Sequence, residues 1–343
     1  MKLVNQIKRW IAWLSLALFL AACRAPAQGA LRAVTQAADP AALTAPAAAA
    51  QPPTTDQPAA PSPAPPTPAP PTLTPTPAPS PTPAPLRFAV IGDFGEGNQG
   101  ELDVSNLVKS WAPDFIITVG DNNYPSGAPE TIDAHIGQYY QEYIFPYQGA
   151  YGPGGAVNRF FPTLGNHDWD TNRAQAHLDY FSLPENERYY DFVAGPVHFF
   201  AVSADSREPD GVSPISAQAQ WLQSGLSAST TPWQIVYFHQ PPYSSGHHGS
   251  VDWMRWPFAA WGADATLGGH DHTYERLQVD GIPYFVNGLG GGPIYDFGAV
   301  LPESQARYNS DYGAMLVQAT PLQVVFQFIT RSGEVIDSWT IQK

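Results

Sequence analysis

Side chains that commonly bind metal ions stand at the ends of several short apolar runs, in the part of this 343-residue chain that begins near Leu86. The residues that close five such runs are Asp93, Asp121, Asn166, His239 and the pair His270 and His272, and Tyr124 follows the second run. A run of β-branched and aromatic residues closed by glycine is typical of a buried strand. In α/β sheets the reactive groups gather at the carboxyl ends of the strands. We therefore expect two carboxylates, a phenol, an amide and three imidazoles to converge at one sheet edge.

This set of donors predicts a site for two metal ions. Two cations a few ångströms apart repel each other, so an anion must lie between them. A carboxylate can contact both ions through its two oxygens, and we assign this bridging position to Asp121. Asp93, the phenolate of Tyr124 and one imidazole are hard donors that favour a trivalent ion. The carbonyl of Asn166, His239 and a second imidazole favour a divalent ion, so the pattern predicts Fe(III) beside a divalent metal.

The last motif, Gly-His-Asp-His, supplies one imidazole to each ion. On an extended segment, residues two apart point to the same side, so His270 and His272 are predicted to face the two ions together. Asp271 then faces away, and we expect it to support the neighbouring loop or an imidazole.

The motifs Gly-Asp-x-Gly, Gly-Asp-x-x-Tyr, Gly-Asn-His-Asp, Val-x-x-His and Gly-His-x-His occur in this order, and the set resembles that of the purple acid phosphatases in the calcineurin-like metallophosphoesterase superfamily. The resemblance covers roughly residues 86–343. Tyr124 and Gly95 are the discriminating positions, because most other metallophosphoesterases have a histidine at the latter and lack the tyrosine. The resemblance implies that Fe(III) is bound by Asp93, Asp121, Tyr124 and His272, and a divalent metal (Fe, Zn or Mn) by Asp121, Asn166, His239 and His270.

The resemblance also implies an acid phosphatase that hydrolyses phosphomonoesters. A water on Fe(III) is acidified far below bulk water, so a metal-bound hydroxide is the expected nucleophile. His167 is predicted to stabilise the phosphoryl oxygens, and either it or His248 to protonate the leaving group. His248 lies in the loop after His239, where the family carries a substrate-facing histidine, and its neighbour His247 remains an alternative. Three further histidines, His135, His177 and His198, are expected to be ordinary surface or core residues.

Two other functions remain open on the same residues. Phosphodiester or nucleotide hydrolysis would differ only in the shape of the pocket, which the sequence does not fix. A catalytically idle surface-binding module would differ by having lost a ligand or a catalytic histidine, and none is missing here.

The charge of the chain favours small substrates. Of 16 Lys and Arg and 30 Asp and Glu, five and two precede Leu86, which leaves 11 against 28 and a formal charge of −17 in residues 86–343. Such acidity opposes binding of nucleic acids, so a small phosphoester is the expected partner. Arg255 and Arg276 are the basic candidates near the site, with a salt bridge expected for Arg276. The oligomeric state is left open.

The N-terminal region predicts export and a lipid anchor. Residues 1–22 have the basic start and short apolar run of a signal peptide. The end of this run, Leu20-Ala21-Ala22-Cys23, resembles the bacterial lipobox, which implies a lipid on Cys23; an ordinary signal peptide is the alternative. Residues 23–85 are rich in Ala, Pro and Thr and are predicted to form a disordered stalk. The protein is thus expected to be secreted, extracytoplasmic and lipid-anchored at the membrane of the bacterial cell envelope.

Residues 86–343 suit one catalytic domain of α/β (α+β) class. Helices are predicted at 100–111, 131–143, 216–227 and 250–261. Strands at 197–203, 284–287, 314–319, 322–329 and 335–341 are predicted to complete a second sheet. The resemblance implies two mixed β-sheets face to face, flanked by helices in a four-layer sandwich. Trp169 is predicted on the pocket rim, and the glycine-rich loop 288–293 is predicted to border the site.

Overall fold

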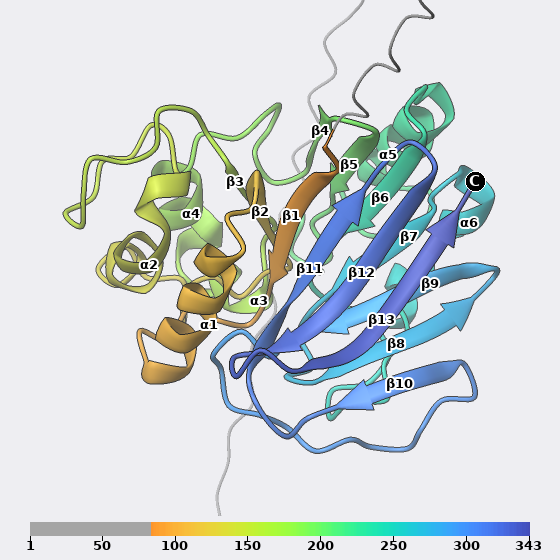
Figure 1. Cartoon of the computed structure of the whole chain (residues 1–343). Coiled ribbons are helices and arrows are strands. Elements are labelled where there is room, and N and C mark those ends of the chain that lie inside the picture. Colours follow the sequence, from red (N-terminus) through yellow and green to blue (C-terminus); the bar gives the residue numbers. More distant parts are fainter. Residues whose placement is uncertain (1–83) are drawn as a thin grey trace, which may run out of the picture. The chain divides into compact units, whose positions relative to one another are not determined.

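The computed structural model describes residues 84–343, and they form two β-sheets with helices around them (Figure 1). The predictions for the signal peptide, for Cys23 and for nearly all of the stalk lie outside the described residues. Within residues 84–343, no helix combines the length and apolar character needed to cross a membrane.

The first sheet combines the start of the domain with its C-terminal end. It has the order β13-β12-β11-β1-β2-β3, with β1 Leu86–Ile91, β2 Phe115–Thr118, β3 Phe160–Pro162, β11 Gly313–Ala319, β12 Gln323–Thr330 and β13 Val335–Gln342. Strands β1, β2 and β3 are parallel, whereas β11 to β13 are antiparallel to their neighbours. The carboxyl ends of β1, β2 and β3 therefore meet at one edge.

The second sheet has seven strands in the order β10-β8-β9-β7-β6-β5-β4. They are β4 Tyr190–Ala194, β5 Val197–Ala201, β6 Trp233–Tyr237, β7 Ala265–Gly268, β8 Tyr274–Val279, β9 Ile282–Asn287 and β10 Ser304–Tyr308. Strands β5, β6, β7 and β9 are parallel, hairpins add β4 and β8, and β10 pairs antiparallel with β8. The ends of β6 and β7 thus supply a second group of side chains to the site.

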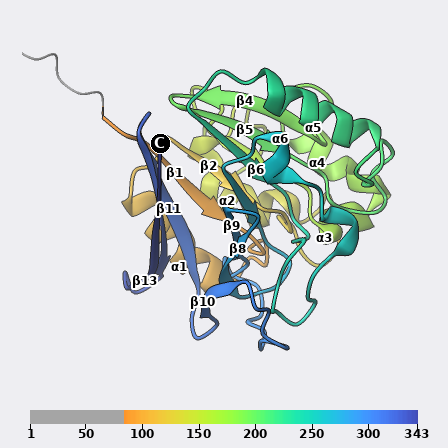
Figure 2. The ribbon, with the colours of Figure 1, turned by 90° about the vertical axis from the view of Figure 1, so that its right-hand side faces the viewer.

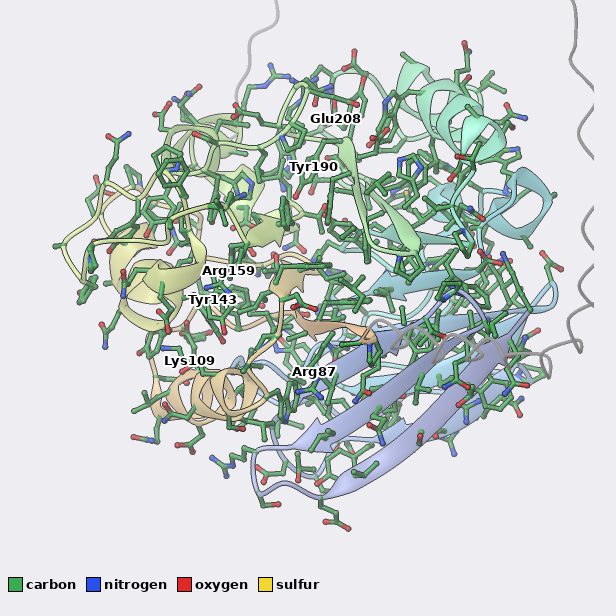
Figure 3. All side chains as sticks on the ribbon, turned by 45° about the horizontal axis from the view of Figure 1, so that its top comes forward. Arg87, Lys109, Tyr143, Arg159, Tyr190 and Glu208 are labelled. Atoms are coloured by element: carbon green, nitrogen blue, oxygen red, sulfur yellow. The ribbon has the colours of Figure 1, made fainter. Side chains whose placement is uncertain are left out.

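The helices lie on the outer faces of the two sheets. They are α1 Gln99–Ser110, α2 Gln138–Tyr140, α3 Asn166–Asp170, α4 Gln175–Tyr180, α5 Ala217–Ala228 and α6 Phe258–Trp261, with a π-turn at Asp133–Gly137 and 3₁₀ turns at Gln141–Tyr143, Asn172–Ala174 and Asp252–Met254. The side chains of Asn98 and Ser216 cap the first turns of α1 and α5. In Figure 3, Arg159 lies beside Tyr143, and its guanidinium is 4.4 Å from the centre of that ring.

Alternating side chains along the strands create three apolar layers. On β1, Phe88 and Val90 pack between the two sheets, where they meet residues such as Phe199 and Ile235 of the second sheet. Ala89 and Ile91 of the same strand face α1 and α2. A third cluster lies between the second sheet and α5 and α6, and α5 lies beside β4 to β6, on their right, in the turned view of Figure 2. These layers confirm the predicted four-layer sandwich of two mixed sheets.

Two predictions about individual elements are wrong. Residues 250–261 form only the short turns Asp252–Met254 and Phe258–Trp261 instead of one helix. Pro257 lies between these turns and lacks the N–H that a continuous helix needs, and it disfavours helical backbone at the residue before it. The predicted strands 314–319, 322–329 and 335–341 exist, but they extend the first sheet through pairing of β11 with β1 and do not complete the second one.

The helix α4 buries a histidine without a partner. His177 is 2% exposed, and neither ring nitrogen has a hydrogen-bond partner among the described residues. Its ring packs against Phe181, with 4.8 Å between ring centres. Burial lowers the pKa of His177 from 6.5 to about 3, because charging the ring in an apolar site is costly. The prediction that His177 is an ordinary core histidine is confirmed.

We expect His177 to make the fold sensitive to acid. Above pH 6.5 the ring is neutral in both the folded and the unfolded chain, and between pH 6.5 and about 3 only the unfolded chain takes up the proton. The free energy of unfolding should therefore decrease as the pH is lowered through this window, by about 2 kcal/mol between pH 7.5 and pH 5. His177→Phe should remove this part of the pH dependence in urea unfolding measured at both pH values. An unchanged difference between the two pH values in the variant would contradict the assignment.

Candidate metal centre

The structure brings the predicted ligands together in two clusters that share one carboxylate. Asp121, His239 and His270 form one cluster, and Asp93, Asp121 and His272 form the other. Within each cluster the ligand atoms lie within 4.8 Å of one another. The same division between two ions follows from the resemblance, with Asp121 as the shared ligand.

Strand ends in strained backbone hold the two carboxylates. Asp93 and Asp121 follow β1 and β2 with φ values of 54° and 51°, a left-handed conformation that non-glycine residues rarely adopt. The Asp93 amide donates to the carbonyl of Gly120, which joins the two turns. Gly120 has φ 88°, and a β-carbon there would lie 2.6 Å from Nδ1 of His239. A β-carbon on Gly165 would collide with Oδ1 of Asp121. The glycines of these motifs therefore permit the close packing of ligands on backbone.

Backbone carbonyls determine which ring nitrogens face the site. Nδ1 of His239 is 2.8 Å from the carbonyl of Val119, and Nδ1 of His272 is 2.5 Å from that of Pro293. A carbonyl only accepts, so these nitrogens carry the protons and both Nε2 atoms keep free lone pairs. His270 instead presents Nδ1, which is 3.2 Å from Nε2 of His239. Two lone pairs at this distance need a shared proton or a cation between them.

Tyr124 and Asn166 complete the two clusters. The Tyr124 hydroxyl is 3.0 Å from Oδ2 of Asp121 and 2.9 Å from Nε2 of His272. Oδ1 of Asn166 is 3.1 Å from Nε2 of His239. All seven predicted ligands thus present a donor atom to one of the clusters.

The electrostatics of the site fit bound cations. Asp93 and Asp121 are 0% and 2% exposed, and within residues 84–343 no Lys or Arg pairs with either of them. Although burial opposes it, the carboxylate of Asp121 raises the pKa of His239 to about 10. Burial and neighbouring imidazoles lower the pKa of His270 to about 2. Buried carboxylates need a compensating positive charge, and neutral imidazoles, a carbonyl and a phenol around them are suitable metal donors.

Both predicted catalytic histidines lie beside these clusters. The ring of His167 is 4.6 Å from that of Tyr124, and its Nε2 is 4.0 Å from Oδ2 of Asp121. Its Nδ1 is 2.5 Å from the carbonyl of Pro125. The exposed ring of His248 stacks on that of His270, with 4.4 Å between the centres.

Two buried carboxylates support the loops that carry these residues. Asp271 accepts hydrogen bonds from the amide of His248 at 2.6 Å and from the hydroxyl of Ser244 at 2.5 Å, so it holds the loop after β6. This contact confirms the predicted supporting role of Asp271. Asp168 accepts from the amides of Gly165 and Asn122, which ties the turn after β2 to the start of α3. Burial and the nearby Asp121 raise the pKa of Asp168 to about 7.

Two expectations about the site are wrong. His270 lies in a bend with φ 70° between β7 and β8 and not on an extended segment, although it and His272 still reach different clusters. Trp169 is 2% exposed and packs with Leu164 and Ala174 instead of lining the rim. Its position within the short helix α3 turns the indole inward, whereas the residues before it, Asn166 and His167, remain accessible. The loop 288–293 does border the site, through the carbonyl of Pro293.

The sequence did not reveal Arg207, which is the basic side chain in contact with a predicted ligand. Its guanidinium donates to the backbone carbonyl of Asn166 at 2.7 Å, to Asp170 at 2.7 Å and to both oxygens of Asp205. Arg207 therefore fixes the start of α3, and four of its five N–H groups are already in use. It precedes no motif and ends no strand, so the sequence held no signal for it. Arg276 forms the expected salt bridge, with Asp337.

Tyr295 was also missed, although it follows the loop that was expected to border the site. Its ring stacks on that of His272, with 4.2 Å between centres and 8° between planes. An aromatic residue two positions after the loop 288–293 was the available signal.

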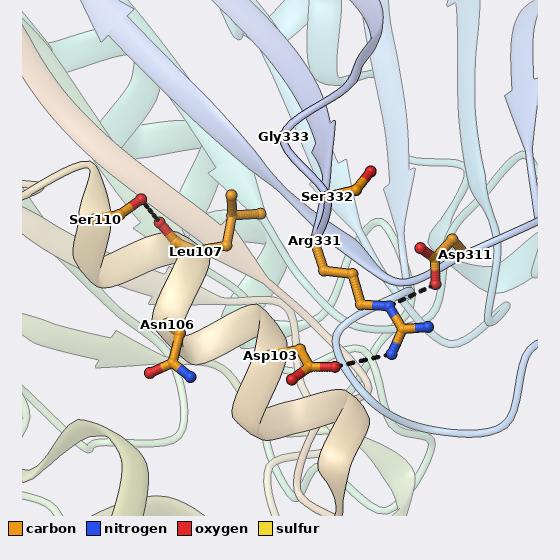
Figure 4. A pocket seen from close by; sticks show the side chains of 8 residues that line it. All are labelled: Asp103, Asn106, Leu107, Ser110, Asp311, Arg331, Ser332 and Gly333. Atoms are coloured by element: carbon orange, nitrogen blue, oxygen red, sulfur yellow. Dashed lines mark hydrogen bonds and ion pairs between the residues drawn. The ribbon is translucent and has the colours of Figure 1, made fainter.

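A separate hollow of about 540 Å³ lies between α1 and the turn that joins β12 and β13 (Figure 4). Arg331 crosses it and pairs with Asp103 at 2.9 Å and Asp311 at 2.8 Å. None of the predicted ligands lines this hollow, and the charge of its arginine is satisfied by the two carboxylates.

Comparison with known proteins agrees with this geometry. Residues 86–274, more than half of the chain, match the family model described as calcineurin-like phosphoesterase. Purple acid phosphatase 15 of Arabidopsis thaliana is 28% identical over 60% of this chain and 45% of its own length. Human tartrate-resistant acid phosphatase type 5 is 26% identical over 73% of this chain and 88% of its own length. The chain thus spans about half of the plant relative and most of the human one.

Two solved structures share the fold. A purple acid phosphatase from yellow lupin seeds aligns with a TM-score of 0.62 at 18% identity, over 76% of this chain and 54% of that one. GAP50 of Plasmodium, titled the anchor in the inner membrane complex, aligns with a TM-score of 0.60 at 20% identity, over 76% of this chain and 89% of that one.

The fold and the shared-carboxylate site define a metallophosphoesterase. The chain belongs to the calcineurin-like phosphoesterase family. Within it, the relatives described above are acid phosphatases, as the motifs predicted. These relatives agree with the predicted class of enzyme, a metal-dependent phosphatase.

Substitution of the shared carboxylate should affect metal binding at both clusters, whereas substitution of an unshared ligand should affect only one. Asp121→Asn removes the negative charge that lets two cations lie close together, so we expect it to lose both ions. His239→Ala alters only one cluster and should lose mainly the divalent ion. Metal content per chain, measured by plasma mass spectrometry after gel filtration, distinguishes the two results. Retention of two full equivalents in Asp121→Asn would disprove the bridging role.

Proposed function

We propose that this chain hydrolyses small phosphomonoesters at a dinuclear site that pairs Fe(III) with a divalent metal, Fe, Zn or Mn. The observation that supports this most strongly is the buried Asp121, whose carboxylate belongs to both ligand clusters. Bound cations would supply an activated water and neutralise charge on the phosphoryl group. We assign Asp93, Tyr124 and His272 to the Fe(III) side, and Asn166, His239 and His270 to the divalent side.

His167 has the position needed to contact the phosphoryl oxygens. Its Nδ1 proton is donated to the carbonyl of Pro125, so only Nε2 can face a substrate. In the imidazolium form Nε2 donates a hydrogen bond to the negative charge that develops on those oxygens. The ring is held in place by its contact with Tyr124.

His248 lies on the opposite cluster, above His270, and is accessible to solvent. Its backbone is held by Asp271, which fixes where the ring lies. We assign it the protonation of the leaving group, with His167 as the alternative donor.

The acidity of the domain supports a small substrate over a long one. Arg207 contacts the site, but four of its five N–H groups are engaged by Asp205, Asp170 and the carbonyl of Asn166. Arg207 thus has little left to offer a polyanion, and nucleic acid is not an expected partner. A catalytically idle module is the competing proposal. A fold neighbour titled as an anchor shows that this fold alone does not decide between them.

A comparison of a monoester with its diester tests the proposed reaction. Metal-loaded protein should turn over an aryl phosphate with a kcat/KM at least ten times that for the corresponding bis-aryl diester. His167→Ala should lower kcat for the monoester by about 10²- to 10³-fold, as loss of a charge-stabilising donor does elsewhere. A preference for the diester would favour the phosphodiesterase alternative, and no turnover of either ester at any pH would favour the idle module.

The colour of the protein tests the Fe(III) assignment. A phenolate on Fe(III) donates electron density into half-filled metal orbitals, which gives a visible charge-transfer band that Zn and Mn(II) sites lack. We expect the purified protein to be coloured and Tyr124→Phe to lose the band, while its far-UV circular dichroism is unchanged. Colourless, fully active protein that contains Zn or Mn would refute the iron assignment and leave the phosphatase intact.

For location, we propose on the sequence alone that the chain is secreted and anchored by a lipid on Cys23 at the cell envelope. A single lipid-modified residue followed by a proline-rich segment would leave the catalytic domain accessible to small extracellular esters. Mass spectrometry of the mature N-terminus decides whether Cys23 carries acyl chains.

A further inference from the structure

Tyr295 is fixed at the rim of the metal centre by its backbone. Its amide donates to the carbonyl of His272 at 3.1 Å, and its own carbonyl accepts from the side chain of Asn309 at 2.9 Å. These two bonds hold the residue directly beside a predicted Fe(III) ligand. These bonds fix the backbone from which the Tyr295 side chain extends.

The ring of Tyr295 forms one wall of the site. It lies parallel to His272, with 4.2 Å between the ring centres. The rings of His247 and His248 approach it to 5.6 and 5.5 Å. On the far side of the same cluster, His167 packs against Tyr124. A substrate on the metals would thus lie among Tyr295, His248 and His167.

The hydroxyl of Tyr295 is available to a substrate. The side chain is half-buried, and within residues 84–343 no protein group hydrogen-bonds to this hydroxyl. Tyr124, the other tyrosine of the site, is instead engaged by Asp121 and His272.

Several N–H donors at the site are already engaged by protein acceptors and cannot contact an anion. A phosphoryl group presents several oxygens, and metals contact only some of them. Arg207 has four of its five N–H groups engaged, and the predicted ligand imidazoles His239 and His272 use their N–H groups on backbone carbonyls. A neutral phenol O–H adjacent to the centre is therefore a suitable further donor.

We propose that Tyr295 contacts the substrate, and that its hydroxyl donates a hydrogen bond to a phosphoryl oxygen while its stacking on His272 holds the ring in place. This role rests on the proposed function, since it assumes that the site binds a phosphoryl group. Hydrogen bonds to charged groups are worth about 1.5 to 3 kcal/mol, which corresponds to about 10- to 100-fold in affinity.

Binding of inorganic phosphate tests the proposal without relying on turnover. Tyr295→Phe keeps the stacked ring and removes only the oxygen. Titration calorimetry of phosphate into metal-loaded protein should show about 10-fold or more weaker binding in this variant, with unchanged metal content and thermal stability. Its kcat/KM for an aryl phosphate should fall by a similar factor.

Tyr308→Phe is the matched control. Tyr308 is a half-buried tyrosine at the end of β10, and its hydroxyl also has no hydrogen-bond partner among residues 84–343, but it packs near Phe328 and outside the two clusters. Its removal should leave phosphate affinity and turnover unchanged. Wild-type phosphate affinity in Tyr295→Phe would overturn the proposal, as would an equal loss in Tyr308→Phe. If the wild type binds phosphate but hydrolyses no ester, the proposed function is wrong. The phosphate affinity of Tyr295→Phe relative to the wild type still decides whether Tyr295 contacts a bound phosphoryl group.

Discussion

The structure depends on two buried carboxylates that pair with no lysine or arginine among residues 84–343. Asp93 and Asp121 are both almost fully inaccessible, and the groups around them are imidazoles, an amide and a phenol. Such burial is strongly unfavourable unless a positive charge enters the site. Left-handed backbone at both residues adds to this cost. Packing of the two sheets offsets this unfavourable free energy, because their apolar interior lies between the strands that end at the site.

Hydrogen bonds from the surrounding loops and strand ends hold these groups in fixed positions. Residues that bind no metal in our assignment, such as Asp168 and Asp271, accept backbone amides from the loops that carry the ligands. Carbonyls at Val119 and Pro293 fix the tautomers of His239 and His272. Each imidazole therefore presents a defined lone pair, which a metal requires and which a freely rotating histidine would not provide.

The sequence predicted the site residues wherever a metal-ligating side chain directly follows the end of a strand. Glycine after an apolar run marks the point where a strand stops, so Asp93, Asp121 and Asn166 could be placed at one edge. The pairing of strands was harder, because β11 to β13 look alike whichever sheet they join, and only the contact of β11 with β1 decides it. Closeness in the chain to a predicted ligand does not place a residue at the site, since Trp169 follows Asn166 by three positions and is buried in the core.

Residues that reach the site from afar left no local pattern. Arg207 contacts Asn166 across 41 positions and Tyr295 stacks on His272 across 23, and neither distance follows from a motif. Their roles differ for a physical reason. The guanidinium of Arg207 pairs with two carboxylates and donates to a carbonyl, so it holds α3 in place and attracts an anion only weakly. A site that holds its arginine in this way depends on bound cations and neutral donors to attract a phosphoryl group. That arrangement favours a compact ester, whose charge the metals can cover, over a long polyanion that would also meet the acidic surface.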